Sequence, residues 1–151
     1  MSADRQADME AAVLRFLDAL HQPGTPHLAA VMTDVFAEAA TYQALVPATE
    51  VRAGRDAIAA ELSRQFTHYS ECDCEVLAIG SSDRFVFTER RDHVAMIDAG
   101  KTIFSSVAAV FEFEAGQVVS WREYWDTGDI SRQLGLTAEQ MAELQPVVDV
   151  T

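Results

Sequence analysis

The longest alternating run in this chain reads FVFTERRDHVAMI and spans residues 85–97. Side chains two positions apart on a strand lie on the same face of a sheet. One face of this run therefore carries a mixed set with apolar ends, namely Val86, Thr88, Arg90, Asp92, Val94 and Met96. The other face carries Phe85, Phe87, Glu89, Arg91, His93 and Ala95. The run predicts a long strand that brings a cation and an anion together on one face.

Further alternating segments lie on both sides of this strand, separated from it and from one another by residues that favour turns. Gly80 to Asp83 precedes the strand, Asp98 to Lys101 follows it, and Ala115 to Gln117 comes further along. These segments predict strands over 41–46, 74–79, 102–114 and 118–126.

Helical periodicity is concentrated ahead of the strands. Apolar residues spaced three and four apart predict an amphipathic helix from Ala7 to about Leu20, ended by Pro23-Gly24. Thr25-Pro26 is a favoured start for a second helix, and its apolar stripe extends as far as Phe36.

A third helix is predicted to begin at Gly54-Arg55-Asp56, and an amphipathic stretch covers 130–134. Thr137 with Gln140 resembles a capping box for a last helical turn. Helices segregated from consecutive antiparallel strands predict an α+β fold in which a curved antiparallel sheet wraps a pocket. A parallel βαβ sheet needs crossover helices, and the last strands have none between them.

Composition limits the classes of partner. A chain of 151 residues is predicted to form a single domain over 1–151, with its core at about 7–135. A net charge of −13 disfavours nucleic acid and anionic membranes. No bilayer-length apolar run or signal peptide is evident, so a cytoplasmic location is expected, with Cys72 and Cys74 as reduced core thiols.

The charged residues of the strands suggest chemistry. Arg90 and Asp92 are close enough on one strand face to pair. Glu123 lies between Trp121 and Trp125 on the more apolar face of its strand, where a carboxylate needs a partner or a raised pKa. The pattern alone leaves two alternatives open: a solvated pair on the outside, or an inverted sheet with Glu123 at the surface.

A tyrosine completes the candidate set. Tyr42 shares a face with Ala44 and Val46, and a phenol on an apolar wall can position water or polarise a substrate oxygen. Two carboxylates, one arginine and one phenol can perform acid–base chemistry without a metal or cofactor. The sequence has no nucleophile elbow, glycine-rich phosphate loop or zinc-ligand spacing.

Several segments together resemble the limonene-1,2-epoxide hydrolase family, within the SnoaL-like and ketosteroid-isomerase-like conical barrels. They are Thr41-Tyr42-Gln43, Gly54-Arg55-Asp56-Ala57, Ile79-Gly80-Ser81-Ser82, Phe87-Thr88-Glu89-Arg90-Arg91-Asp92, Gly100-Lys101 and Trp121-Arg122-Glu123-Tyr124-Trp125-Asp126. The resemblance implies a mixed, mostly antiparallel sheet forming a conical barrel, with N-terminal helices covering the pocket.

The resemblance also implies catalytic roles. Asp92 corresponds to the general acid, Arg90 to the bridging arginine, Glu123 to the base that activates water, and Tyr42 to a residue that holds the water. Two departures stand out: the base is glutamate where the family usually has aspartate, and Ala44 stands where the family has a water-holding asparagine. The substrate pocket is expected to be apolar and to include Ala44, Val94, Met96, Trp121 and Trp125.

These expectations give three hypotheses. The first is a cofactor-independent epoxide hydrolase acting on a small apolar epoxide. The second is a SnoaL-like cyclase or isomerase of a polyketide or terpenoid substrate, and the third is a non-catalytic ligand-binding module. A homodimer is expected to cover an apolar outer sheet face that includes Phe85 and Phe87, with Phe111 or Phe113 as further candidates.

Overall fold

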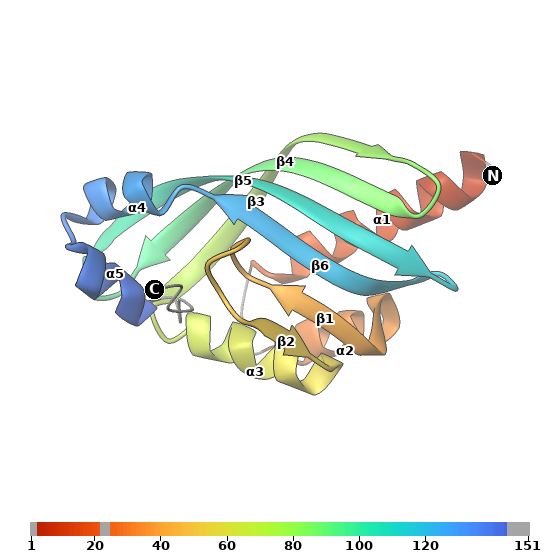
Figure 1. Ribbon diagram of the computed structural model, residues 1–151, viewed down its shortest axis with the longest axis horizontal. Coiled ribbons are helices and arrows are strands. Elements are labelled where there is room, and N and C mark those ends of the chain that lie inside the picture. Colours follow the sequence, from red (N-terminus) through yellow and green to blue (C-terminus); the bar gives the residue numbers. More distant parts are fainter. Residues whose placement is uncertain (1–2, 22–24, 145–151) are drawn as a thin grey trace.

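The computed structural model describes residues 3–21 and 25–144 (Figure 1). Two helices precede the first strand, a third follows a short edge strand, four long strands come next, and two short helices end the described chain. The elements are α1 (Ala3–Ala19), α2 (Pro26–Val35), β1 (Phe36–Gln43), β2 (Val51–Ala53), α3 (Arg55–Gln65), β3 (Tyr69–Ser81), β4 (Phe85–Met96), β5 (Lys101–Glu114), β6 (Gln117–Trp125), α4 (Thr127–Leu134) and α5 (Ala138–Leu144).

The six strands form one sheet in the order β2-β1-β6-β5-β4-β3. Only the β1–β6 pair is parallel, so the predicted α+β class with a mixed, mostly antiparallel sheet is confirmed. Figure 1 shows the long strands as a curved layer with α1, α2 and α3 gathered along it and beside β1. Contacts of α1 with β3 and β4, and of α3 with β1 and β2, hold these helices against the sheet.

Local sequence signals explain most element ends. The Thr25 hydroxyl accepts a hydrogen bond from the Leu28 amide and caps α2, as predicted. Thr137 and Gln140 exchange the two hydrogen bonds of a capping box at the start of α5. The β5–β6 hairpin turns through Ala115 and Gly116, both with positive φ as a two-residue turn of this twist requires. The predicted break at Pro23-Gly24 lies outside the described residues.

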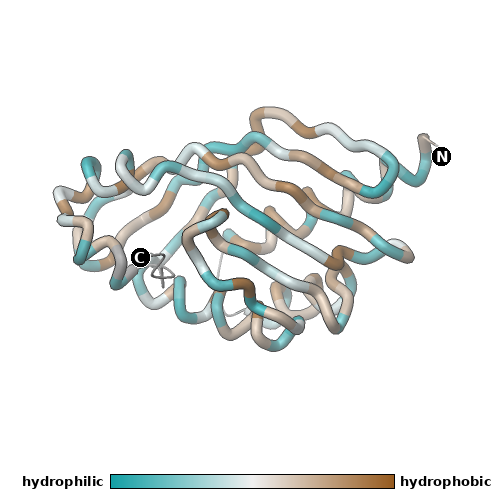
Figure 2. The backbone as a smooth tube through the Cα atoms, in the orientation of Figure 1, coloured by the Kyte–Doolittle hydropathy of each residue, from teal (hydrophilic) through white to brown (hydrophobic). Residues whose placement is uncertain are grey.

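The core is aromatic at its centre. Phe16 of α1 packs edge-on against Phe36 and Trp121, with ring centroids 4.8 and 5.0 Å apart. Phe111 of β5 stacks on Trp121 at 5.7 Å. Figure 2 shows apolar and polar stretches following one another along the long strands as brown and teal segments. These contacts tie α1 to β1, β5 and β6 and fix the curvature of the sheet behind the pocket.

The structure corrects three predictions about element positions. Phe36 does not belong to the α2 stripe: it is the first residue of β1, which starts five residues earlier than the predicted Thr41 and ends at Gln43. The edge strand β2 was not predicted. On β6 a register shift opposite Glu112 and Phe113 turns Val118 inward, whereas strict alternation from Trp121 and Glu123 places Val119 on that face.

The predicted outer face also needs correction. Phe111 and Phe113 are buried, because the odd-numbered residues of the second half of β5 all point into the core. The large apolar side chains exposed on the sheet are instead Val51, Leu77, Phe87, Phe104 and Tyr124, while Phe85 is half-buried. Among the described helices, none is long and apolar enough to cross a membrane.

Candidate active site

Three charged side chains meet on the concave side of the sheet. Arg90 and Asp92 occupy the buried face of β4, and Glu123 occupies the buried face of β6. β5 lies between these strands, so the Arg90 side chain must cross it, passing the position of Val107 with which it pairs. Neighbouring strands are about 4.8 Å apart, a span that a long arginine side chain covers.

Arg90 bridges the two carboxylates. Its Nε and Nη2 donate to the two oxygens of Asp92 at 2.9 and 2.8 Å. Its Nη1 lies 2.6 Å from Oε2 of Glu123. The exposed fractions are 2% for Arg90 and 8% for both Asp92 and Glu123. The Arg90–Asp92 pair is therefore not solvated on the outer face, and Glu123 is not at the surface.

The electrostatics of this cluster favour holding one proton. Two carboxylates and one guanidinium carry a net charge of −1 in a buried setting, and one bound proton makes the cluster neutral. Burial raises the pKa of Glu123 above its ordinary value, and the charge of Arg90 only partly offsets this effect. Burial lowers the pKa of Arg90, but Glu123 and Asp92 more than compensate and keep the guanidinium charged.

Tyr42 joins the cluster from β1. The parallel pairing of β1 with β6 sets Tyr42 beside Trp121, and the two rings stack with centroids 4.0 Å apart. The Tyr42 hydroxyl accepts a hydrogen bond from Nε2 of Gln65 at 3.2 Å. Burial, followed by the charge of Glu123, raises the pKa of Tyr42 well above its ordinary value, so the phenol keeps its proton.

These groups border a cavity with about 120 Å³ of room for the centres of water molecules. That space admits a water together with a small organic molecule. Tyr42, Asp92 and Glu123 line it, as do the expected substrate-binding residues Ala44, Val94, Met96 and Trp125.

Trp121 departs from the expectation. It is buried behind the cavity wall, where its Nε1 donates to Oε2 of Glu123 at 3.2 Å. The Trp125 indole instead borders the cavity, and its Nε1 donates to the carbonyl oxygen of Ala44 at 2.8 Å. Trp121 therefore orients the Glu123 carboxylate and lies outside the cavity lining.

Comparison with known families agrees with this geometry. The family model of the limonene-1,2-epoxide hydrolase catalytic domain matches residues 7–135. This chain belongs to the limonene-1,2-epoxide hydrolase family. The match includes all four residues of the candidate catalytic set and most of the cavity lining.

Solved structures similar to this family member share its fold. A proposed SnoaL-like polyketide cyclase from Jannaschia sp. CCS1 superposes with a TM-score of 0.77 at 14% identity, over 91% of this chain and 97% of that one. An LEH-like epoxide hydrolase from M. tuberculosis gives 0.70 at 22% identity, over 85% and 90%. Bal32a from a soil-derived mobile gene cassette gives 0.68 at 22% identity, over 80% and 91%. At these sequence identities, the similarity shows a shared fold alone.

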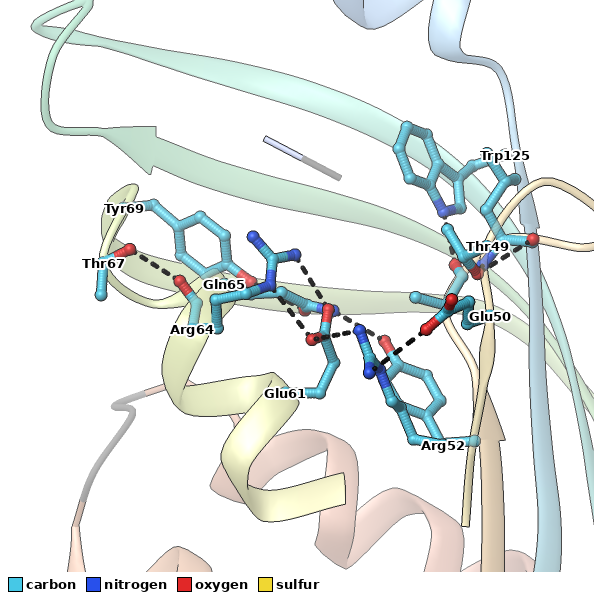
Figure 3. Close-up of polar contacts among 12 residues, drawn as sticks. Thr49, Glu50, Arg52, Glu61, Arg64, Gln65, Thr67, Tyr69 and Trp125 are labelled. Carbon is cyan, nitrogen blue, oxygen red and sulfur yellow. Dashed lines mark hydrogen bonds and ion pairs between the residues drawn. The ribbon is translucent and has the colours of Figure 1, made fainter. Parts of the chain in front are cut away.

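The helical part of this candidate site was not predicted from the sequence. Gln65 of α3, with His68 and Tyr69 just after the helix, lines the cavity, as do residues of α4 and α5. Figure 3 shows Glu61 between the guanidinium groups of Arg64 and Arg52, with Gln65 close to Tyr69. A signal was present: Glu61 and Gln65 are one turn apart and adjoin the apolar stripe of α3, which places two polar groups on its buried side.

One side-chain group within the described ranges is close enough to hold a metal ion. The ligand atoms of Cys72, Cys74 and Asp92 lie within 4.8 Å of one another. Both Asp92 oxygens already accept hydrogen bonds from Arg90, whose charge opposes a cation at that point. A hydrogen bond with Cys72 and burial raise the pKa of Cys74, which disfavours the thiolate that a soft metal needs. The donor set therefore does not favour a metal centre.

Proposed function

We propose that this protein is an epoxide hydrolase that opens a small apolar epoxide with water in one step. The observation that carries the proposal is the buried Arg90, which bridges Asp92 at 2.8 Å and Glu123 at 2.6 Å beside a largely apolar cavity. Burying three charged groups costs free energy of desolvation, so their presence beside the cavity suggests a functional role. Two carboxylates bridged by one arginine suit proton transfer.

Glu123 removes one proton from water while the water oxygen attacks a ring carbon of the epoxide. The bond from that carbon to the epoxide oxygen breaks, and Asp92 gives its proton to the departing oxygen. The product is a vicinal diol, and the catalytic cluster still holds one proton, now on Glu123. Exchange with solvent restores the starting state. Arg90 stays charged throughout and offsets the negative charge that moves between the two carboxylates.

The raised pKa of Glu123 suits the role of a base, because a carboxylate with a higher pKa accepts a proton from water more readily. Tyr42, kept neutral by burial, donates a hydrogen bond to the attacking water. The reaction requires no metal or cofactor. Ala44, Val94, Met96 and Trp125 provide apolar contacts that suit an uncharged substrate.

A second candidate is a cyclase or isomerase of a polyketide or terpenoid substrate. Ala44, which contributes no polar side chain to the cavity wall, favours it, since a substrate hydroxyl can then take the place of water. Hydrolysis and cyclisation differ in the source of the new oxygen: in oxygen-18 water the hydrolase product is labelled and the cyclase product is not. The third hypothesis, a non-catalytic ligand-binding module, predicts ligand retention without turnover.

We also propose that the chain folds as a single domain, that it is cytoplasmic, and that two copies associate as a homodimer. The exposed Phe87, Phe104 and Tyr124 on the outer sheet face support this assembly. Light scattering at micromolar concentration is expected to give twice the mass of one chain. The mass of a single chain under those conditions contradicts the dimer.

The experiment that tests the proposed reaction is diol formation from a panel of terpene, aryl and cyclohexene epoxides. The wild-type protein is expected to turn over at least one of them, and Glu123→Gln and Asp92→Asn are each expected to reduce that turnover by about 10²–10⁴-fold. Wild-type rates in both variants contradict the mechanism. If no epoxide in the panel is opened, the cyclase or isomerase hypothesis takes precedence.

A further inference from the structure

Gln65 is a buried amide with only 7% of its surface exposed, and it borders the cavity that also contains Tyr42 and Glu123. It comes from the last turn of α3, an element far from the catalytic strands in sequence. Its Nε2 donates to the Tyr42 hydroxyl at 3.2 Å and to Oε1 of Glu61 at 3.3 Å. Both hydrogens of the amide nitrogen are thereby used.

Glu61 fixes which way the amide points. An ionised carboxylate only accepts hydrogen bonds, so the nitrogen of Gln65 must face Glu61 and the oxygen must face the other way. Glu61 stays ionised: burial raises its pKa, but hydrogen bonds and charge from Arg64, together with Gln65 and Arg52, more than offset that effect. Figure 3 shows this chain of contacts from the arginines through Glu61 to Gln65. Oε1 of Gln65 is accordingly left as an acceptor on the Tyr69 side.

The amide also directs the Tyr42 hydroxyl. Because the phenol oxygen accepts from Gln65, its own hydrogen must point elsewhere. Among the described residues, the Tyr42 hydroxyl accepts this hydrogen bond but has no acceptor for its own hydrogen. Oε1 of Gln65 accepts a long bond of 3.4 Å from the Tyr69 hydroxyl and has a second lone pair available. The cavity therefore offers one directed donor and one directed acceptor close to the base.

A nucleophilic water needs this combination. One of its hydrogens goes to the base and one lone pair attacks carbon, which leaves one hydrogen and one lone pair to be held in place. We infer that Gln65 is a catalytic residue that holds the attacking water: its Oε1 accepts the second hydrogen, the Tyr42 hydroxyl donates to the remaining lone pair, and Glu123 takes the first hydrogen. Glu61 is a positioning residue that acts through Gln65.

This inference rests on the proposed hydrolysis and sharpens it, because it states how the cavity selects water over a bulkier hydroxyl nucleophile. Methanol resembles water except that a methyl group replaces the hydrogen that Oε1 accepts. Attack by methanol forms a β-methoxy alcohol by the same proton transfers, so the ratio of ether to diol reports on the held hydrogen. A residue that only supports the fold does not change that ratio.

The kinetic experiment compares wild-type protein with Gln65→Leu, which removes the amide and leaves an apolar side chain of similar width. Diol formation is expected to fall by roughly 100-fold in kcat, with KM for the epoxide within about threefold of wild type. In a water–methanol mixture the ether-to-diol ratio is expected to rise. Glu61→Gln is expected to show a smaller change in the same direction, because its amide no longer fixes the orientation of Gln65.

Gln117→Leu is the matched control. It also removes an amide whose nitrogen donates two hydrogen bonds, here to the carbonyl oxygens of Asp34 and Phe36, away from the cavity. Its ether-to-diol ratio is expected to equal that of wild type. If Gln65→Leu has the same kcat and the same ether-to-diol ratio as wild type, the inference is overturned. If the wild-type protein itself opens no epoxide, the result counts against the proposed function instead.

A second measurement tests the inference without a substrate and without the Gln65→Leu variant, so it applies even if that variant fails to fold. A high-resolution crystal structure of the wild-type protein is expected to contain a water within hydrogen-bond distance of Oε1 of Gln65, the Tyr42 hydroxyl and the Glu123 carboxylate. If that water is absent, or if it contacts Tyr42 and Glu123 while Gln65 points away, Gln65 does not hold the nucleophile.

Discussion

Two buried glutamates differ in their surroundings, which shift their pKa values in opposite directions: Glu123 lines the cavity, and Glu61 accepts a hydrogen bond from the lining residue Gln65. Glu61 of α3 is 5% exposed and Glu123 of β6 is 8% exposed, but protein atoms surround Glu123 much more deeply, so desolvation weighs more heavily on Glu123. Glu61 has two arginines, Arg64 and Arg52, and its pKa is lowered. Glu123 shares one arginine with Asp92, and its pKa is raised.

The difference shows how one physical rule produces two roles. A carboxylate with more than one cation is locked in its charged form and serves as a fixed anchor. Two carboxylates that share one cation retain a proton that can move. We therefore propose that the α3 cluster stabilises and orients, whereas the β4–β6 cluster transfers protons.

The largest effect is expected from Arg90→Leu. The substitution leaves two buried carboxylates without their cation and is expected to lower the free energy of unfolding by roughly 3–5 kcal/mol and to abolish turnover. Urea denaturation measures the first and diol formation the second. Arg91→Leu, on the exposed face of the same strand, is the control and is expected to change stability by about 0.5 kcal/mol or less. Equal losses in the two variants contradict a special role for the bridge.

Glu123→Gln is expected to reduce turnover by about 10²–10⁴-fold, the usual contribution of a general base. Stability is expected to change by only about 1 kcal/mol, because the amide removes a buried charge while retaining a partner for Trp121. Steady-state kinetics and a denaturation curve on the same preparation separate the two effects. A large loss of stability in this variant argues that Glu123 is structural in the same way as Glu61.

Glu61→Gln is expected to have the opposite profile. Loss of the charge leaves Arg64 and Arg52 with a weaker partner and lowers the free energy of unfolding by about 1–3 kcal/mol. Turnover is expected to fall less than in Glu123→Gln, since Glu61 acts only through Gln65. Chemical denaturation of both variants in parallel gives the comparison directly. Full wild-type stability in Glu61→Gln contradicts the anchor role.

The smallest expected effect is a pair of opposite pH slopes in stability. The folded state binds the Glu123 proton more tightly than the unfolded state does, so this contribution is present at low pH and is lost as pH rises through the raised pKa. For Glu61 the contribution is present above the unfolded pKa and is lost as pH falls through the lowered one. The difference in unfolding free energy between wild type and each Gln variant, measured from about pH 2 to about pH 8, should therefore fall with rising pH for Glu123 and rise with pH for Glu61, whose change lies below the ordinary carboxyl pKa. Parallel slopes contradict the comparison.

The sequence predicts the strands of the candidate site well because their decisive property is local. Alternation places Arg90 and Asp92 on one face whatever the rest of the chain does, and Glu123 follows from its position between two tryptophans. The prediction failed where the answer depends on a partner strand. The register shift that turns Val118 inward, and the burial of Phe111 and Phe113, come from pairing and packing across the sheet.

The helical half of the site is harder to predict for the same reason. Gln65 and Glu61 are ordinary helix residues by type, and only the packing of α3 against β1 turns them toward Tyr42. Their position beside the apolar stripe indicates burial but not the partner. A polar pair on the buried side of a helix thus marks a site to examine, and tertiary contacts decide what it does.

The most direct test of the central claim is a single turnover of an accepted epoxide in oxygen-18 water, with enzyme in excess. Direct attack by water held at Glu123 predicts one labelled oxygen in the diol formed in the first turnover. A first-turnover diol without label requires an oxygen from a protein carboxylate and contradicts the one-step mechanism.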